Sequence, residues 1–133
     1  MSAALSRRIR DDSGSAVAEF SLVAGLLTVL TLSVIQLGLA LLVRNTVLDA
    51  AAEGARTAAL ADTTRADGAE RTRQLITTAI GEGYAGDIDV SYETWNGQPC
   101  AEVTVTTTLP IIGLVGIEHG LEVSGHAVRE TLD

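Results

Sequence analysis

The sequence predicts an α+β fold, in which a long N-terminal transmembrane helix continues into a small domain with a second helix and a three-stranded antiparallel sheet. Three observations support this prediction. A stretch of 24 residues without a charged side chain runs from Phe20 to Val43. An alanine-rich segment with helical character follows it, and the C-terminal half alternates apolar and polar residues as strands do. At 133 residues, the chain has room for one compact domain beyond the helix.

The apolar stretch is long enough to cross a bilayer, because as an α-helix it spans roughly 36 Å against a hydrocarbon core of about 30 Å. A buried core helix is the first alternative, but so small a chain could hardly cover a segment that is apolar all round. A cleaved secretory signal is the second, since Ala50 and Ala52 resemble a small-residue cleavage site. The apolar region of such signals is only about 7–15 residues long, which disfavours this alternative.

Basic residues flank the stretch unequally. Arg7, Arg8 and Arg10 precede it, whereas only Arg44 follows closely. By the positive-inside rule, the N-terminus is expected in the cytoplasm, with the C-terminal part outside the bacterial cytoplasmic membrane. The predicted organisation is a basic cytoplasmic leader (1–14), the helix start and transmembrane span (15–43) and an extracytoplasmic α+β domain (44–133).

Small and polar residues interrupt the span and the segment after it. Ser21 and Gly25 form a small-xxx-small pair that permits close packing of helices in lipid. Gln36 is the only strongly polar side chain deep in the span, and it would prefer a hydrogen-bonding partner such as another helix. Further on, Gly54 among alanines allows another element to approach closely. Packing within the domain and contact with a neighbouring subunit are both open interpretations of that glycine.

The exported domain is expected to begin with a continuation of the first helix over 45–61, where alanines are frequent. Asp62-Thr63-Thr64 and Asp67-Gly68 predict a loop. A second helix is expected from Ala69 to Gly81, with Leu75, Ile76, Ala79 and Ile80 as its apolar stripe.

Three strands are expected after the second helix, over 88–94, 101–109 and 121–128, because apolar and polar residues alternate there. Asn96-Gly97 predicts a two-residue hairpin between the first two strands. An antiparallel sheet with one solvated face and one face covered by helix follows from this pattern. The apolar connection 110–117 is expected to form a helical turn that closes the core, or alternatively a surface that contacts a partner or the membrane.

The most informative segment lies directly before the span, from Gly14 to Phe20 (GSAVAEF). Glu19 places a carboxylate at the edge of an apolar helix, where burial is costly unless the charge is paired. Cleavage after Gly14 would give Ser15 a new ammonium group, which is a suitable partner, and would make Glu19 the fifth residue of the mature chain. A carboxylate near a helix N-terminus is also favoured by the helix macrodipole.

This pattern resembles the class III signal of type IV pilins and pseudopilins. The segment AEGARTAA (52–59) is similar to the Ala-rich E-G-A-R segment of TadE-like proteins, which are pilin-like components of the Tad (tight adherence) pilus system. The closing LEVSGHAVRE (121–130) is similar to the last strand of that family. By these residues, and mainly over 12–61, the chain is identified as a member of the TadE-like family.

The resemblance implies a function and a set of site residues. A prepilin peptidase is expected to cut between Gly14 and Ser15 on the cytoplasmic side and to leave the apolar helix attached. Glu19 and Phe20 are the expected assembly residues, with Glu19 pairing with the N-terminus of a neighbouring subunit. The implied function is that of a minor pilin or pseudopilin-like subunit, whose partners are the bilayer, other pilin-like subunits, the peptidase and the Tad assembly machinery.

The alternative to this function is a glutamate at the interface beside a plain anchor. The protein would then be an uncleaved single-pass membrane-anchored protein whose extracytoplasmic domain binds a ligand or partner. Processing after Gly14 separates the two hypotheses.

No catalytic constellation is visible in the sequence, so we expect no enzymatic activity, no cofactor and no metal site. The two histidines are expected on the surface, His119 in a loop and His126 on the polar face of a strand, without the three or four ligands at suitable spacing that a zinc site needs. Cys100 is the single thiol and has no evident activating base. From Gly86 onward, eight acidic residues are accompanied by one basic residue, so nucleic-acid binding is not expected.

Overall fold

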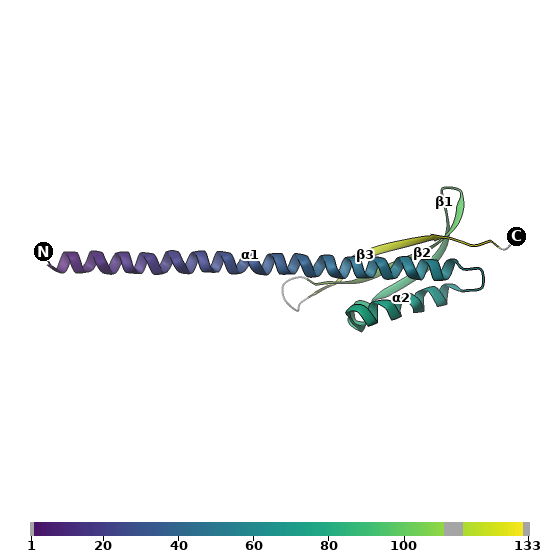
Figure 1. The fold of residues 1–133 in the computed structure, drawn as a ribbon, viewed down its shortest axis with the longest axis horizontal. Coiled ribbons are helices and arrows are strands. Elements are labelled where there is room, and N and C mark those ends of the chain that lie inside the picture. The colour runs from purple at the N-terminus through teal and green to yellow at the C-terminus, as the bar shows by residue number, and fades with distance from the viewer. Residues whose placement is uncertain (1, 111–115, 132–133) are drawn as a thin grey trace. The chain divides into compact units, whose positions relative to one another are not determined.

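The computed structural model describes residues 2–110 and 116–131, and the side chains of residues 12–110 and 120–131. The chain forms two compact units, Met1–Leu37 and Gly38–Asp133. Helix α1 (Ser2–Ala59) contributes residues to both units, and helix α2 (Arg65–Ile80), the short 3-10 helix η1 (Glu82–Tyr84) and three strands belong to the second unit (Figure 1). The α+β fold class predicted from the sequence is confirmed.

Helix α1 begins at Ser2, well before the start expected at residue 15, and ends at Ala59, close to the end expected at residue 61. The leader contains no glycine or proline before Gly14 and holds two alanines and three arginines, which favour helix. The second compact unit begins at Gly38, and Val43, the last residue of the expected span, is only 4% exposed. The division into leader, span and exported domain stays a prediction.

The first unit is notable for large apolar side chains on its surface. Phe20, Leu22 and Leu26 are 74%, 72% and 65% exposed. Within the described residues, α1 is the one helix that is long and apolar enough to cross a membrane. Such an N-terminal helix indicates membrane anchoring, because lipid is the solvent in which side chains of this kind are stable without a protein cover.

Helix α2 begins earlier than expected, and the predicted loop at Asp67-Gly68 is wrong. Thr64 is the N-cap residue, and its hydroxyl accepts a hydrogen bond from the Asp67 N–H at 3.3 Å. The Asp67 side chain accepts in return from the Thr64 N–H at 2.7 Å, which completes a capping box. Aspartate and glycine are turn residues in most contexts, but here the cap places Asp67 in the first helical turn.

The close packing of α2 on α1 explains the glycine in the alanine-rich segment. A Cβ atom added at Gly54 would collide with the Thr72 hydroxyl and lie 2.8 Å from the Gly68 carbonyl oxygen. A Cβ atom added at Gly68 would lie 2.6 Å from Cβ of Ala58. The two glycines therefore let the helix backbones approach, so Gly54 serves packing within the domain.

The sheet has the order β1-β2-β3, with β1 (Asp87–Trp95), β2 (Gln98–Pro110) and β3 (Gly116–Val128) all antiparallel. Asn96 and Gly97 have φ angles of 51° and 80°, as the predicted two-residue hairpin requires. Strand β2 is longer than expected, since its first residues pair with the end of β1. Of the apolar connection expected over 110–117, residues 111–115 lie outside the described residues, while Pro110 and Gly116 are paired in the sheet.

The core of the second unit lies between the sheet, α2 and the C-terminal part of α1 (Figure 1). A Cβ atom added at Gly125 of β3 would lie 2.5 Å from the backbone nitrogen of Ala52, so the strand rests directly on the helix. The buried apolar side chains are small or medium in size, with Ile76 the largest of those that are fully buried. The core residues are Val43, Val47, Ala50, Ala51, Ala55, Ala58, Ala59, Ile76, Val90, Ala101, Val103, Val105 and Val123.

Candidate processing and assembly site

The four residues predicted as the site lie on α1 in the first unit. Gly14, Ser15, Glu19 and Phe20 are all exposed. Ser15 and Glu19 are one helical turn apart and line the same shallow hollow on the helix, together with Leu22. The structure therefore presents the predicted cleavage point, the predicted new N-terminus and the acidic side chain on one accessible stretch of helix.

Glu19 is the last charged residue before the apolar run that begins at Phe20. Among the described side chains, it makes no hydrogen bond and no ion pair. A carboxylate at this position can accept a charge-assisted hydrogen bond from an ammonium group, and such a bond becomes stronger where water is excluded. No described side chain provides that group to Glu19.

The predicted scissile bond between Gly14 and Ser15 lies inside the helix. Glycine in a helix interior costs about 1 kcal/mol relative to alanine, so Gly14 weakens the helix at this point. Nothing in the described part of the chain lies within 4 Å of a Cβ atom built on Gly14. The bond is thus reachable, and local unwinding there breaks no tertiary contact.

A cluster that sequence reasoning missed closes the C-terminal end of α1. The Tyr92 hydroxyl donates to the carbonyl oxygen of Ala58 at 3.2 Å. The guanidinium carbons of Arg65 and Arg129 lie 5.3 and 4.0 Å from the centre of the Tyr92 ring. Positive charge near a helix C-terminus is favoured by the macrodipole, so this cluster has a structural role. No local sequence motif predicts this cluster, because its members come from four separate segments.

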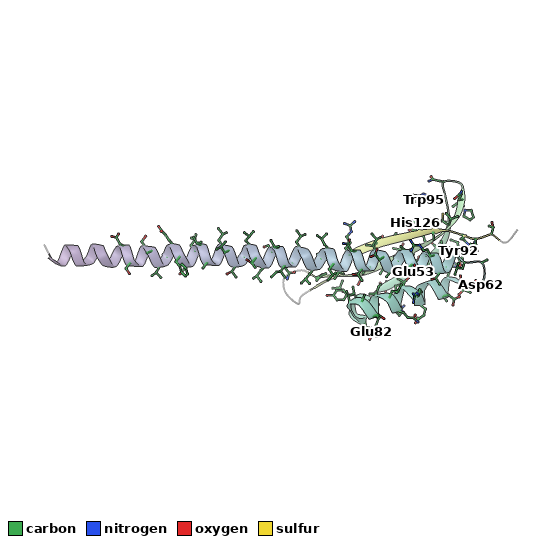
Figure 2. All side chains as sticks on the ribbon, in the orientation of Figure 1. Glu53, Asp62, Glu82, Tyr92, Trp95 and His126 are labelled. Atoms are coloured by element: carbon green, nitrogen blue, oxygen red, sulfur yellow. The ribbon has the colours of Figure 1, made fainter. Side chains whose placement is uncertain are left out.

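A second missed cluster lies on the outer face of the sheet near the hairpin. The rings of Trp95 and His126 are 4.9 Å apart between centroids, and Nε2 of His126 is 3.4 Å from Oε2 of Glu102 (Figure 2). Trp95 and His126 come from the two outer strands, and Cys100 lies on the central strand between them in the register. Cys100 is 4% exposed.

His126 is not part of a metal-binding group among the described side chains. Within residues 12–110 and 120–131, no group of three or more His, Cys, Asp or Glu side chains is arranged to hold an ion. The expectation that His119 lies in a loop is wrong, because its backbone belongs to β3.

The fold and the exposed N-terminal helix define the class of this protein as a small α+β protein with an N-terminal apolar helix that indicates membrane anchoring. The family model described as TadE-like protein matches residues 14–56, from the predicted cleavage point to the E-G-A-R segment. This match confirms the resemblance to the TadE-like family and associates the chain with the Tad pilus. No curated protein and no solved structure matches the chain.

Proposed function

We propose that the protein is a minor pilin or pseudopilin-like subunit that takes part in assembly of a Tad-type pilus. The observation that carries this proposal is the TadE-like match, which begins at Gly14 and covers Ser15, Glu19 and the whole apolar run. The α+β arrangement behind a single apolar helix agrees with it. The TadE-like family is a pilus-associated structural family, and accordingly we propose no enzymatic activity for the chain.

The proposed mechanism starts with insertion of the apolar helix, with the basic leader in the cytoplasm and the second unit outside the membrane. A prepilin peptidase then hydrolyses the bond between Gly14 and Ser15, and Ser15 acquires a free ammonium group. The span remains attached to the domain, so the processed protein stays in the bilayer. Removal of the leader also removes its three arginines, which otherwise hold the N-terminus at the cytoplasmic surface.

Glu19 directs docking in this mechanism. Its carboxylate has no partner among the described side chains and sits next to Phe20, at the point where the helix becomes apolar. When processed helices pack side by side, the Ser15 ammonium of one subunit neutralises the Glu19 carboxylate of its neighbour. An unpaired carboxylate in the membrane is costly, so this pairing favours one register of packing over others.

The test is a comparison of Glu19 variants in cells that contain the complete Tad machinery. Glu19→Ala and Glu19→Gln are expected to reduce piliation, while the amount of protein in the membrane fraction stays at the wild-type level. Glu19→Asp keeps the charge and is expected to retain part of the activity. Glu53→Gln, which removes an exposed carboxylate later in the same helix, is the matched control and leaves piliation unchanged. Normal piliation with Glu19→Gln contradicts the proposed role.

A further inference from the structure

Strand β3 runs alongside the C-terminal part of α1 and in the same direction (Figure 1). A Cβ atom added at Gly125 would lie 2.5 Å from the backbone nitrogen of Ala52, and the Glu130 N–H donates to the carbonyl oxygen of Ala59 at 2.9 Å. Between these two contacts, each residue of the strand accompanies about 1.4 residues of the helix, because a strand rises more per residue. The start of β3 at Gly116 therefore lies level with the last turn of the expected span.

The burial of α1 agrees with this position of the sheet. Val43 is the last residue of the expected span, yet it is buried in the core of the second unit. The neighbouring Leu41 and Leu42 are exposed, as are the other large apolar side chains of the span. The second unit thus covers one side of α1 at the level where the span ends.

Helix α2 returns towards the same level. A Cβ atom added at Gly68, near the start of α2, would lie 2.6 Å from Cβ of Ala58. Ala79, near the end of α2, lines a hollow together with Thr46 and Ala50 of α1. Because α2 is antiparallel to α1, its last residues lie level with Thr46, close to the end of the expected span.

The short helix η1 completes this end of the second unit. It follows α2 directly, and the carbonyl oxygen of Tyr84 accepts a hydrogen bond from the Thr107 hydroxyl at 2.6 Å, near the end of β2. The end of the unit formed by η1 and the neighbouring ends of β2 and β3 is named the base here. Its residues are Tyr84, Leu109, Pro110 and Gly116.

The base has the chemistry of a surface between lipid and water. Tyr84 and Leu109 are half-buried, so each keeps part of its side chain open to the surroundings. Tyrosine is enriched where a membrane meets water, because its ring is apolar and its hydroxyl is polar. Pro110 and Gly116 are paired in the sheet, and such pairing of the backbone is needed where little water is available.

The charged side chains near the base are compatible with a lipid surface. Arg44 is exposed on α1 directly after the expected span, where a guanidinium group can bind the phosphates of lipid headgroups. Glu82 of η1 is exposed and points away from α1 (Figure 2), so its carboxylate can remain in water.

The dimensions of a bilayer bring the base into contact with it. The hydrocarbon core is about 30 Å thick and the whole bilayer about 40–45 Å, so each headgroup layer corresponds to about four helix residues. The base lies level with the stretch of α1 between the last turn of the span and Thr46. If the span ends at Val43, this stretch lies at the boundary between hydrocarbon and headgroups.

We propose that the base of the second unit is embedded in the headgroup layer of the membrane, so that the lipid surface is a binding partner of this unit as well as of the span. Lipid is the occupant that fits, because the base is continuous with the span and α1 brings both to the bilayer at the same level. The inference rests on the membrane span in the proposed function, but it does not depend on cleavage after Gly14.

The test uses quenching of tryptophan fluorescence by lipids that are brominated near the headgroup. Trp95 is the only tryptophan, and it lies at the opposite end of β2, roughly 40 Å from the base. In the full chain in phosphatidylcholine liposomes, we expect no quenching of Trp95. Tyr84→Trp in a Trp95→Phe background moves the indole to the base, where its fluorescence is expected to fall about twofold. Leu109→Trp in the same background is a second, independent reporter.

A reporter in the span separates failure of this inference from failure of the proposed function. Leu30→Trp in the Trp95→Phe background is expected to be quenched by lipids brominated in the middle of the acyl chains. If it is quenched while both base reporters, folded by circular dichroism, are not, the inference is wrong and the span stands. If no reporter is quenched, the span and the inference fail together.

Two further outcomes also overturn the inference. Equal quenching of Trp95 and of the base reporters shows that the second unit does not contact lipid through its base. Protection of the base reporters from aqueous iodide only after other pilus proteins are added shows that the base binds protein and not lipid.

Discussion

Helix α1 contains two stretches that differ in the size and the exposure of their apolar side chains. Between Phe20 and Leu37 the apolar side chains are large and lie on the surface, with Leu30 and Leu37 still 58% and 62% exposed. Between Val43 and Ala59 most apolar side chains are small and buried, and Val47, Ala51 and Ala55 are fully covered, while Leu48 is 38% exposed. Large side chains maximise contact with lipid, whereas small ones let a strand and a second helix reach the backbone.

The comparison shows that the apolar character of a helix does not by itself say what covers it. Side-chain size carries that information here, because close packing against protein needs alanine and glycine where lipid accepts leucine and phenylalanine. It follows that equal substitutions in the two stretches have unequal effects on the stability of the second unit.

The largest difference is expected for removal of a buried side chain. Ile76 of α2 is completely buried against this part of α1, and Ile76→Ala should lower the free energy of unfolding by about 2–5 kcal/mol. Leu26→Ala shortens a side chain that is 65% exposed. This substitution should change the free energy of unfolding by less than about 0.5 kcal/mol. Urea unfolding of the full chain in detergent micelles, followed by the fluorescence of Trp95, measures both. Equal losses in the two variants contradict the comparison.

A smaller effect, but one of opposite sign in the two stretches, is expected for glycine. Gly54→Ala forces a methyl group against Thr72 and Gly68, which should cost about 1–3 kcal/mol of unfolding free energy. Gly25→Ala places the same group where nothing in the described chain lies within 4 Å, and it should be neutral or stabilise by at most about 1 kcal/mol. The same urea titration distinguishes the two. Stabilisation by Gly54→Ala would show that α2 does not pack closely on α1.

The smallest effect concerns acid pH and is confined to the second unit. Hydrogen bonds from the backbone and side chain of Thr64 lower the pKa of Asp67 below its usual 3.8. Because the folded state favours the ionised carboxylate, this stabilisation is present above pH 3.8 and is lost as the pH falls through the lowered value. Asp67→Asn should therefore reduce the fall in the free energy of unfolding at acid pH. The size of the change is about that of one capping interaction. Urea unfolding of wild type and variant between pH 2 and pH 6 measures it. An identical acid limb in wild type and variant contradicts this assignment.

The sequence predicted most of the fold because its signals are local. The apolar run, the Asn96-Gly97 turn and the alternation over β1 to β3 each depend on neighbouring residues, and each was confirmed. The error at Asp67-Gly68 arose because two turn residues were weighed without Thr64, whose spacing to Asp67 is that of a capping box. Residues that act across the fold could not be found in this way. Tyr92 reaches Ala58, and Trp95 reaches His126, only after the sheet has formed and packed on α1.

The cleavage and assembly roles of the candidate site stay predictions. Gly14, Ser15 and Glu19 follow from a short motif, and the structure places them on one exposed stretch of α1. Their proposed partners belong to other chains, so neither the sequence nor a single chain contains them.

Cleavage between Gly14 and Ser15 is the event on which the proposed function depends. The intact mass of the membrane-extracted protein, expressed together with its native prepilin peptidase, measures it directly, with Gly14→Ala as the control. The proposal predicts a product that begins at Ser15 in the wild type and a full-length chain in the control. A full-length wild-type chain in the presence of an active peptidase contradicts the proposal, leaves Glu19 without its role and favours an uncleaved anchor that displays a binding domain.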